Sequence, residues 1–323
     1  MLTWYESLPD AITAARTRGR PILSLRMLGR LQDELSCANS RFFRTTLYPD
    51  ARVAALLADR VVLHVRSVRP VPVLTIDFGD GRPLVRTVTG NSAHLVLDQE
   101  GRPVDALPGL FDATTFVALV EAACALATDT AGTAGAARQA RLARWHRDRR
   151  DAIVAAWAAD VDVGVDVDVD VGVGVGVGVG VAAGASIPAL EAATGDDTWE
   201  RLAAARAGAA LPSDRSEILR RFPSARAAGE LAVGKRMVER PLLDLLEPLG
   251  RSIAEDTLRN QYRLHRRVHE RFMEGEAGEA DALEAWIYRA LFLMPLEDPW
   301  LGLRPPAYAA LLDEPPVRDE PPA

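Results

Sequence analysis

The stretch from Trp4 to Leu25, WYESLPDAITAARTRGRPILSL, predicts a helix that leads directly into a buried strand. The expected helix covers Asp10 to Arg18, with apolar residues at helical spacing, and it stops at Gly19, two residues before a proline. Residues 22–25 are mostly apolar and start a strand. This succession is the beginning of an alternating α/β unit.

The chain continues this pattern up to residue 128. A second helix is expected from Ala51 to Leu57 behind a capping residue, Asp50, and the β-branched run at 61–65 predicts a second buried strand. Two hairpins with glycine-containing turns and a closing amphipathic helix are expected next, at residues 73–89, 93–106 and 111–126. The predicted order is therefore βαβ first and an antiparallel hairpin with a closing helix afterwards.

Composition narrows the class of protein. The chain has 323 residues, of which 48% are hydrophobic, so it can bury a sizeable core. Its formal net charge of −7 argues against a dedicated nucleic-acid binder. The two cysteines, Cys37 and Cys124, are too few for a disulfide framework or a four-cysteine zinc site. No signal peptide or long apolar run is visible, so we expect a cytoplasmic protein that binds no membrane.

Four segments are expected along the chain. Residues 1–128 form the α/β domain, and residues 129–194 are a linker that joins it to an all-α domain at 195–312. The linker combines an Arg-rich helix with a strict alternation of Val and Asp or Gly at 161–181, which predicts low order. The last segment, 313–323, is rich in proline and acidic residues and is expected to be a disordered tail.

Two segments carry a resemblance to a known family. The entry Trp4 to Leu23 and the stretch AHLVLDQEGRPVDALPG at Ala93–Gly109, followed by the helix at 111–126, resemble the thioredoxin-like superfamily. The resemblance covers the first domain and none of the rest. It implies an α/β/α sandwich with a redox cysteine at the start of the helix after the first core strand.

Cys37 falls near the position that this resemblance gives to the nucleophilic cysteine. The string Cys37–Ser40, CANS, is a C-x-x-S variant in which Ser40 replaces the resolving cysteine. A helix N-terminus favours thiolate over thiol, and Arg41 adds positive charge nearby. A single thiolate can form a mixed disulfide, but an external thiol must resolve it. The expected catalytic residues are therefore Cys37 and Ser40, with Asn39 and Arg41 in support.

The family's cis-proline is also missing. Asn91 and Ser92 precede the Ala93 strand where the resemblance places that proline, so they complete the set of supporting residues. One hypothesis is an atypical monothiol protein that acts on protein thiols, protein disulfides or a low-molecular-weight thiol without a cofactor. The alternative is a non-catalytic scaffold in which the thioredoxin-like domain is degenerate and the helical domain binds a partner. The oligomeric state stays open.

The segment 255–269 could form either a metal site or a solvated helix face. His265 and His269 are four residues apart on an expected helix, and Glu255 or Asp256 could complete a ligand set. The neighbouring arginines make the segment basic; they are Arg263, Arg266, Arg267 and Arg271. This charge favours a solvated helix face and no metal. Cys124 lies in an apolar helical run and is expected to serve packing alone.

Overall fold

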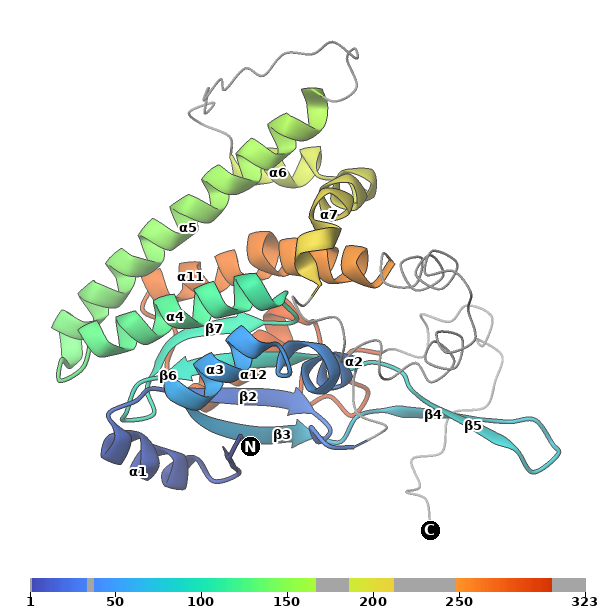
Figure 1. The fold of residues 1–323 in the computed structure, drawn as a ribbon, viewed down its shortest axis with the longest axis horizontal. Coiled ribbons are helices and arrows are strands. Elements are labelled where there is room, and N and C mark those ends of the chain that lie inside the picture. Colours follow the sequence, from blue (N-terminus) through green and yellow to red (C-terminus); the bar gives the residue numbers. More distant parts are fainter. Residues whose placement is uncertain (1, 34–37, 167–185, 212–247, 304–323) are drawn as a thin grey trace, which may run out of the picture.

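The computed structural model describes residues 2–33, 38–166, 186–211 and 248–303. A five-stranded mixed sheet with the order β1-β3-β2-β6-β7 forms its centre (Figure 1). The strands are β1 (Trp4–Tyr5), β2 (Ile22–Leu28), β3 (Val62–Arg69), β6 (Ser92–Leu97) and β7 (Pro103–Pro108). Strands β1, β3 and β2 run parallel, whereas β2 pairs with β6, and β6 with β7, in antiparallel fashion.

The two predicted hairpins are confirmed. Strands β6 and β7 form one hairpin within the main sheet, and β4 (Val73–Asp77) with β5 (Pro83–Thr87) forms a separate two-stranded sheet. This second hairpin projects away from the main sheet (Figure 1). Its turn contains Gly79 and Gly81, both with positive φ, which is the conformation that glycine adopts at no steric cost.

Capping residues set the start of the helices in the first half. Helix α1 (Leu8–Arg18) starts two residues earlier than predicted, because the Ser7 hydroxyl caps it by accepting from the Asp10 amide. Asp50 caps α3 (Ala51–Asp59) as predicted, and Asp112 caps α4 (Ala113–Asp129) in the same way. Between α1 and α3 lie the short α2 (Ala38–Phe42) and the π-helix η1 (Phe43–Leu47).

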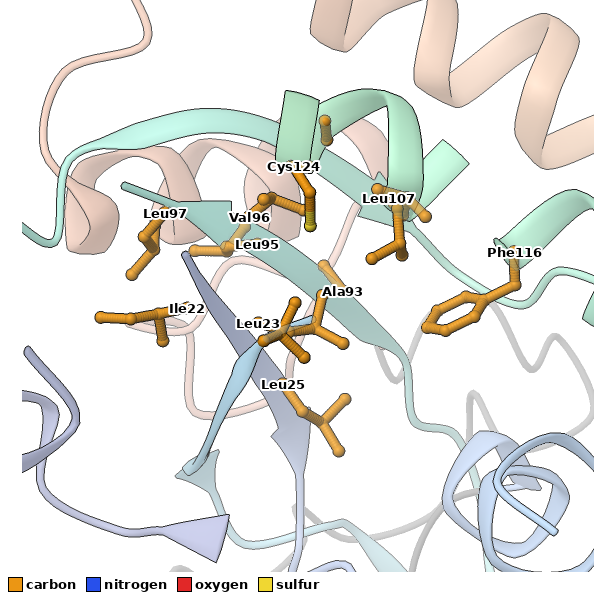
Figure 2. Close-up of a cluster of buried hydrophobic side chains, with 14 of the residues drawn as sticks. Ile22, Leu23, Leu25, Ala93, Leu95, Val96, Leu97, Leu107, Phe116 and Cys124 are labelled. Carbon is orange, nitrogen blue, oxygen red and sulfur yellow. The ribbon is translucent and has the colours of Figure 1, made fainter. Parts of the chain in front are cut away.

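The main core lies between the sheet and α4. Leu25 of β2, Val96 of β6 and Leu107 of β7 are fully buried under Phe116 and Cys124 of α4 (Figure 2). Burial raises the pKa of the Cys124 thiol to about 11, so it stays protonated and unreactive at neutral pH. The predicted packing role of Cys124 is confirmed.

Helices from the second half contribute to this core and to further hydrophobic clusters beside it. They are α5 (Gly135–Asp166), α6 (Ile187–Ala193), α7 (Asp196–Ala210), a helix at 248–259 that continues through the π-helix η2 (Asn260–His265) into α11 (Arg266–Met273), and α12 (Ala280–Trp286) followed by the π-helix η3 (Ile287–Leu291). Phe272, Leu283 and Ile287 belong to the cluster that contains the buried residues of the sheet. A second cluster around Trp157 and Trp199 is purely helical. The described chain is therefore a mixed α/β structure in which late helices also pack on the sheet.

The expectation of low order throughout the repeat in the linker is wrong. Helix α5 runs to Asp166 and so enters the Val/Asp repeat, and Val161 packs in the cluster around Trp157. Helix α7 begins after Gly195, which takes the capping position without a side-chain bond. The rest of the repeat, residues 212–247 and 304–312 of the expected all-α domain, and the tail at 313–323 lie outside the described residues. No helix among the described residues is long and apolar enough to cross a membrane.

Candidate functional sites

The predicted thiol site is described only in part, because Cys37 itself lies outside the described residues. Helix α2 begins at the next residue, after the carboxyl end of β2. The Asn39 side-chain amide donates to Oδ1 of Asn91 at 3.1 Å and to Oγ of Ser92 at 3.0 Å. The structure thus brings together the start of α2 and the start of β6.

The other two residues of this set point to different environments. Ser40 is fully buried, whereas Arg41 is exposed to solvent. A second arginine of the same helical stretch, Arg44, donates to the backbone carbonyls of Gln32 and Asp33. These bonds hold the chain that approaches Cys37 against η1.

A buried polar pair, Tyr48 and His94, packs against Phe43 of η1. The Tyr48 hydroxyl and Nε2 of His94 are 2.8 Å apart, and the His94 ring packs edge-on against Phe43 and Phe116. Burial lowers the pKa of His94 to about 3, so the imidazole is neutral at physiological pH. Spacing along the chain could not predict this pair, because Tyr48 and His94 are 46 residues apart.

A second group of polar side chains is buried where the late helices meet the edge strand β7. His265 and His269 are both within 1% of complete burial, so the expectation of a solvated helix face is wrong. They lie on the side of η2 and α11 that packs against α5 and β7, and two further polar residues join them: His146 of α5 and Asp105 of β7. We call these four residues the histidine cluster.

Hydrogen bonds connect the members of the histidine cluster. Nδ1 of His146 is 2.7 Å from Nδ1 of His269, and Nε2 of His146 is 2.9 Å from the carbonyl oxygen of Val104. Because a carbonyl only accepts, Nε2 of His146 carries the proton, and its Nδ1 accepts a hydrogen bond from the Nδ1–H of His269. Nε2 of His265 lies 3.1 Å and 3.2 Å from the two carboxylate oxygens of Asp105.

Burial and charge set the protonation of this cluster. Burial lowers the pKa of His146 to about 4 and holds that of His269 well below its usual value. Burial alone would raise the pKa of Asp105, but the adjacent His265 outweighs it and the net pKa is lower than usual. At neutral pH the cluster therefore presents a carboxylate together with neutral imidazoles at positions 146 and 269, which are donor groups for a metal ion.

The acidic residues proposed from the sequence are not part of this cluster. Glu255 pairs with Arg259 at 2.8 Å instead, and Asp256 lies on the same turn. Neither Asp105 nor His146 could be found from spacing, because they precede His265 by 160 and 119 residues. The one local signal was the pair of histidines four residues apart.

A third buried network joins the sheet to α12. The fully buried Arg26 of β2 donates to Oγ of Ser24 and to Oε2 of Glu284, at 2.8 Å and 2.7 Å. His64 of β3 lies 2.7 Å from the same serine oxygen, and burial lowers its pKa to about 4. This network ties α12 to the face of the sheet opposite α4.

No protein-family model matches this chain, and comparisons with curated proteins and with solved structures also found no match.

Proposed function

We propose that this chain is an atypical thioredoxin-like protein that exchanges disulfides through a single thiol, Cys37. The observation that supports this most directly is the double hydrogen bond from Asn39 to Asn91 and Ser92. It joins the helix that follows Cys37 to the segment where the resemblance places the cis-proline. The parallel β2–β3 pair, the later antiparallel hairpin and the closing helix α4 also support the proposal.

The chemistry needs one nucleophile and an external thiol. The Cys37 thiolate attacks one sulfur of a substrate disulfide, a new S–S bond forms, and the second substrate sulfur leaves with the electron pair of the broken bond. Ser40 cannot resolve this mixed disulfide, because a hydroxyl is not a thiol. A second thiolate, from a protein or a low-molecular-weight thiol, attacks the Cys37 sulfur and releases the product. The attacking thiols lose their protons to water, and the leaving thiolates take up protons from water.

The test is the pH dependence of iodoacetamide labelling of the full chain, followed at each cysteine by peptide mass spectrometry. Buried Cys124 is the internal control and should remain unlabelled until the protein unfolds. An ordinary thiol titrates near pH 8.5, so a Cys37 midpoint of about 7 or lower is expected for a stabilised thiolate. Incubation with oxidised glutathione should then add one glutathione at Cys37, and Cys37→Ser should add none.

The opposite result favours the scaffold hypothesis. A Cys37 midpoint at about 8.5 or higher, with no glutathione adduct in the folded protein, would leave no chemistry at this position. The thioredoxin-like unit would then be a non-catalytic framework for partner binding.

A further inference from the structure

We propose that the histidine cluster binds a divalent transition metal ion, with Zn²⁺ as the best match, held by Asp105, His146 and His269. These three residues come from β7, α5 and α11, and one potential ligand atom from each lies within 4.8 Å of the others. Two imidazoles and one carboxylate form a donor set that suits zinc and related ions.

The hydrogen bond to Val104 prepares His146 for this role. A metal-binding histidine usually donates its second ring N–H to a carbonyl or carboxylate, which fixes the tautomer and the orientation of the ring. Nε2 of His146 donates to the Val104 carbonyl on the same strand as Asp105, so Nδ1 is the atom left for a metal. His265 orients the carboxylate in the same manner through Nε2.

The distances require only a small adjustment. Two nitrogens on a tetrahedral Zn²⁺ with bonds of about 2.0–2.1 Å lie about 3.3 Å apart. The Nδ1 atoms of His146 and His269 are 2.7 Å apart, which is the separation of a hydrogen bond. A metal in place of the shared proton moves the rings apart by a few tenths of an ångström, with the His269 proton on Nε2.

The charge balance of the cluster also favours a cation. Asp105 is a carboxylate that is 1% exposed, and a buried charge is costly unless it is compensated. Besides His265, it accepts from the backbone amide of Ala106. Among the described residues, Nδ1 of His265 is buried without a hydrogen-bond partner, so hydrogen bonds alone do not satisfy this cluster.

The arginines that argued against a metal are directed elsewhere. Arg266 pairs with Glu270 and Glu191, and Arg267 donates to the carbonyl of Ala290. The other two stack on tryptophan rings away from the cluster, Arg263 over Trp199 and Arg271 over Trp286. The basic residues of this segment therefore leave the interior free for a cation.

A metal here would clamp the edge of the sheet. Helix α11 packs along α5 and contacts β7, and His146 of α5 is bonded to the Val104 carbonyl of β7. The three ligands lie far apart in the sequence, so the ion would cross-link the described first domain to the later helices. The complete burial of the three ligands favours a role for the ion in holding the fold together.

The experiment uses tag-free full-length protein. Metal content is measured after desalting, and the melting temperature is followed while Zn²⁺ is added to chelator-treated protein. We expect about one Zn²⁺ per chain and a saturable rise in melting temperature. Asp105→Asn and His269→Gln should each weaken binding at least tenfold, whereas His94→Phe, which changes a buried histidine outside the cluster, should keep one equivalent.

The wild-type protein provides a test that does not depend on the variants folding. Co²⁺ in place of Zn²⁺ should give the visible absorption bands of a tetrahedral nitrogen and oxygen site. Absence of metal together with no Zn²⁺-induced rise in melting temperature would overturn the proposal. Equal metal binding by wild type and folded Asp105→Asn would overturn it as well, since the ion would then sit elsewhere. Neither result bears on Cys37.

Discussion

Two glycines in neighbouring helices should respond in opposite ways to the same substitution. Gly208 is an exposed residue of α7, and no atom lies within 4 Å of the position that a Cβ would take. Gly250 is buried in the helix at 248–259, and a Cβ there would lie 2.5 Å from the backbone oxygen of Ala207 and 3.1 Å from Cγ of Leu211. Both glycines are helical, so the two sites differ only in the room that is available for a Cβ atom.

The expected magnitudes follow from this difference. Gly208→Ala reduces the entropy of the unfolded chain without a clash, so it should stabilise the protein by about 0.5–1 kcal/mol. Gly250→Ala brings the same benefit but pushes against a backbone atom that cannot rotate away. Overpacking costs about 1–3 kcal/mol, so the net effect should be a loss of about 0.5–2 kcal/mol.

The assay is urea unfolding of the full chain, followed by tryptophan fluorescence and circular dichroism, with thermal melts as a second measurement. Each kcal/mol corresponds to a shift of about 1.5 °C for a chain of 323 residues, because the unfolding entropy is about 2.1 cal/mol/K per residue. The two variants should move the midpoint in opposite directions. A rise in stability for Gly250→Ala equal to that for Gly208→Ala would refute the close contact between α7 and the helix at 248–259.

Two further predictions concern buried polar side chains. Because His94 and His64 are neutral in the fold, with pKa values lowered to about 3 and about 4, the unfolded chain binds more protons below pH 6.5. Stability should therefore fall as the pH drops from 6.5 towards 4, and His94→Phe should flatten this slope; identical slopes would contradict the assignment. Thr194 accepts from Nε1 of buried Trp157 at 2.9 Å, so Thr194→Val should cost about 1–3 kcal/mol. Thr13 is an exposed threonine that bonds only a helix carbonyl, and Thr13→Val should change stability by less than about 0.5 kcal/mol; equal costs would argue against the tryptophan bond.

The sequence predicted the features that depend on nearby residues. The turn glycines, the cap Asp50 and the alternation of short apolar runs each act within a few residues, and the hairpins and α3 follow from them. It could not predict that α12 would lie on the sheet, since that contact depends on Arg26 meeting Glu284 across more than 250 residues. The sequence of an amphipathic helix predicts which of its faces is buried but not which surface that face packs against. The predicted boundary between an α/β domain and a helical domain rests on hydrophobic periodicity. Periodicity predicts the type of each element, but it does not predict that elements from both parts share one hydrophobic core.

The histidine cluster shows why arginines that are close in sequence to a helical residue do not predict the charges that surround its side chain. Successive residues of a helix point about 100° apart, so Arg267 and Arg271, two positions from His269, project about 200° around the axis from it. They reach a carbonyl and a tryptophan ring on other surfaces, whereas the ring of His269 meets His146 from another helix. Burial has the largest effect on the pKa of His269 and lowers it; His265 lowers it further, whereas Asp105, which lies 164 positions earlier in the chain, raises it. The spacing of four between the two histidines did place both on one buried side of the helix, whereas the arginines in the same segment are directed to other surfaces.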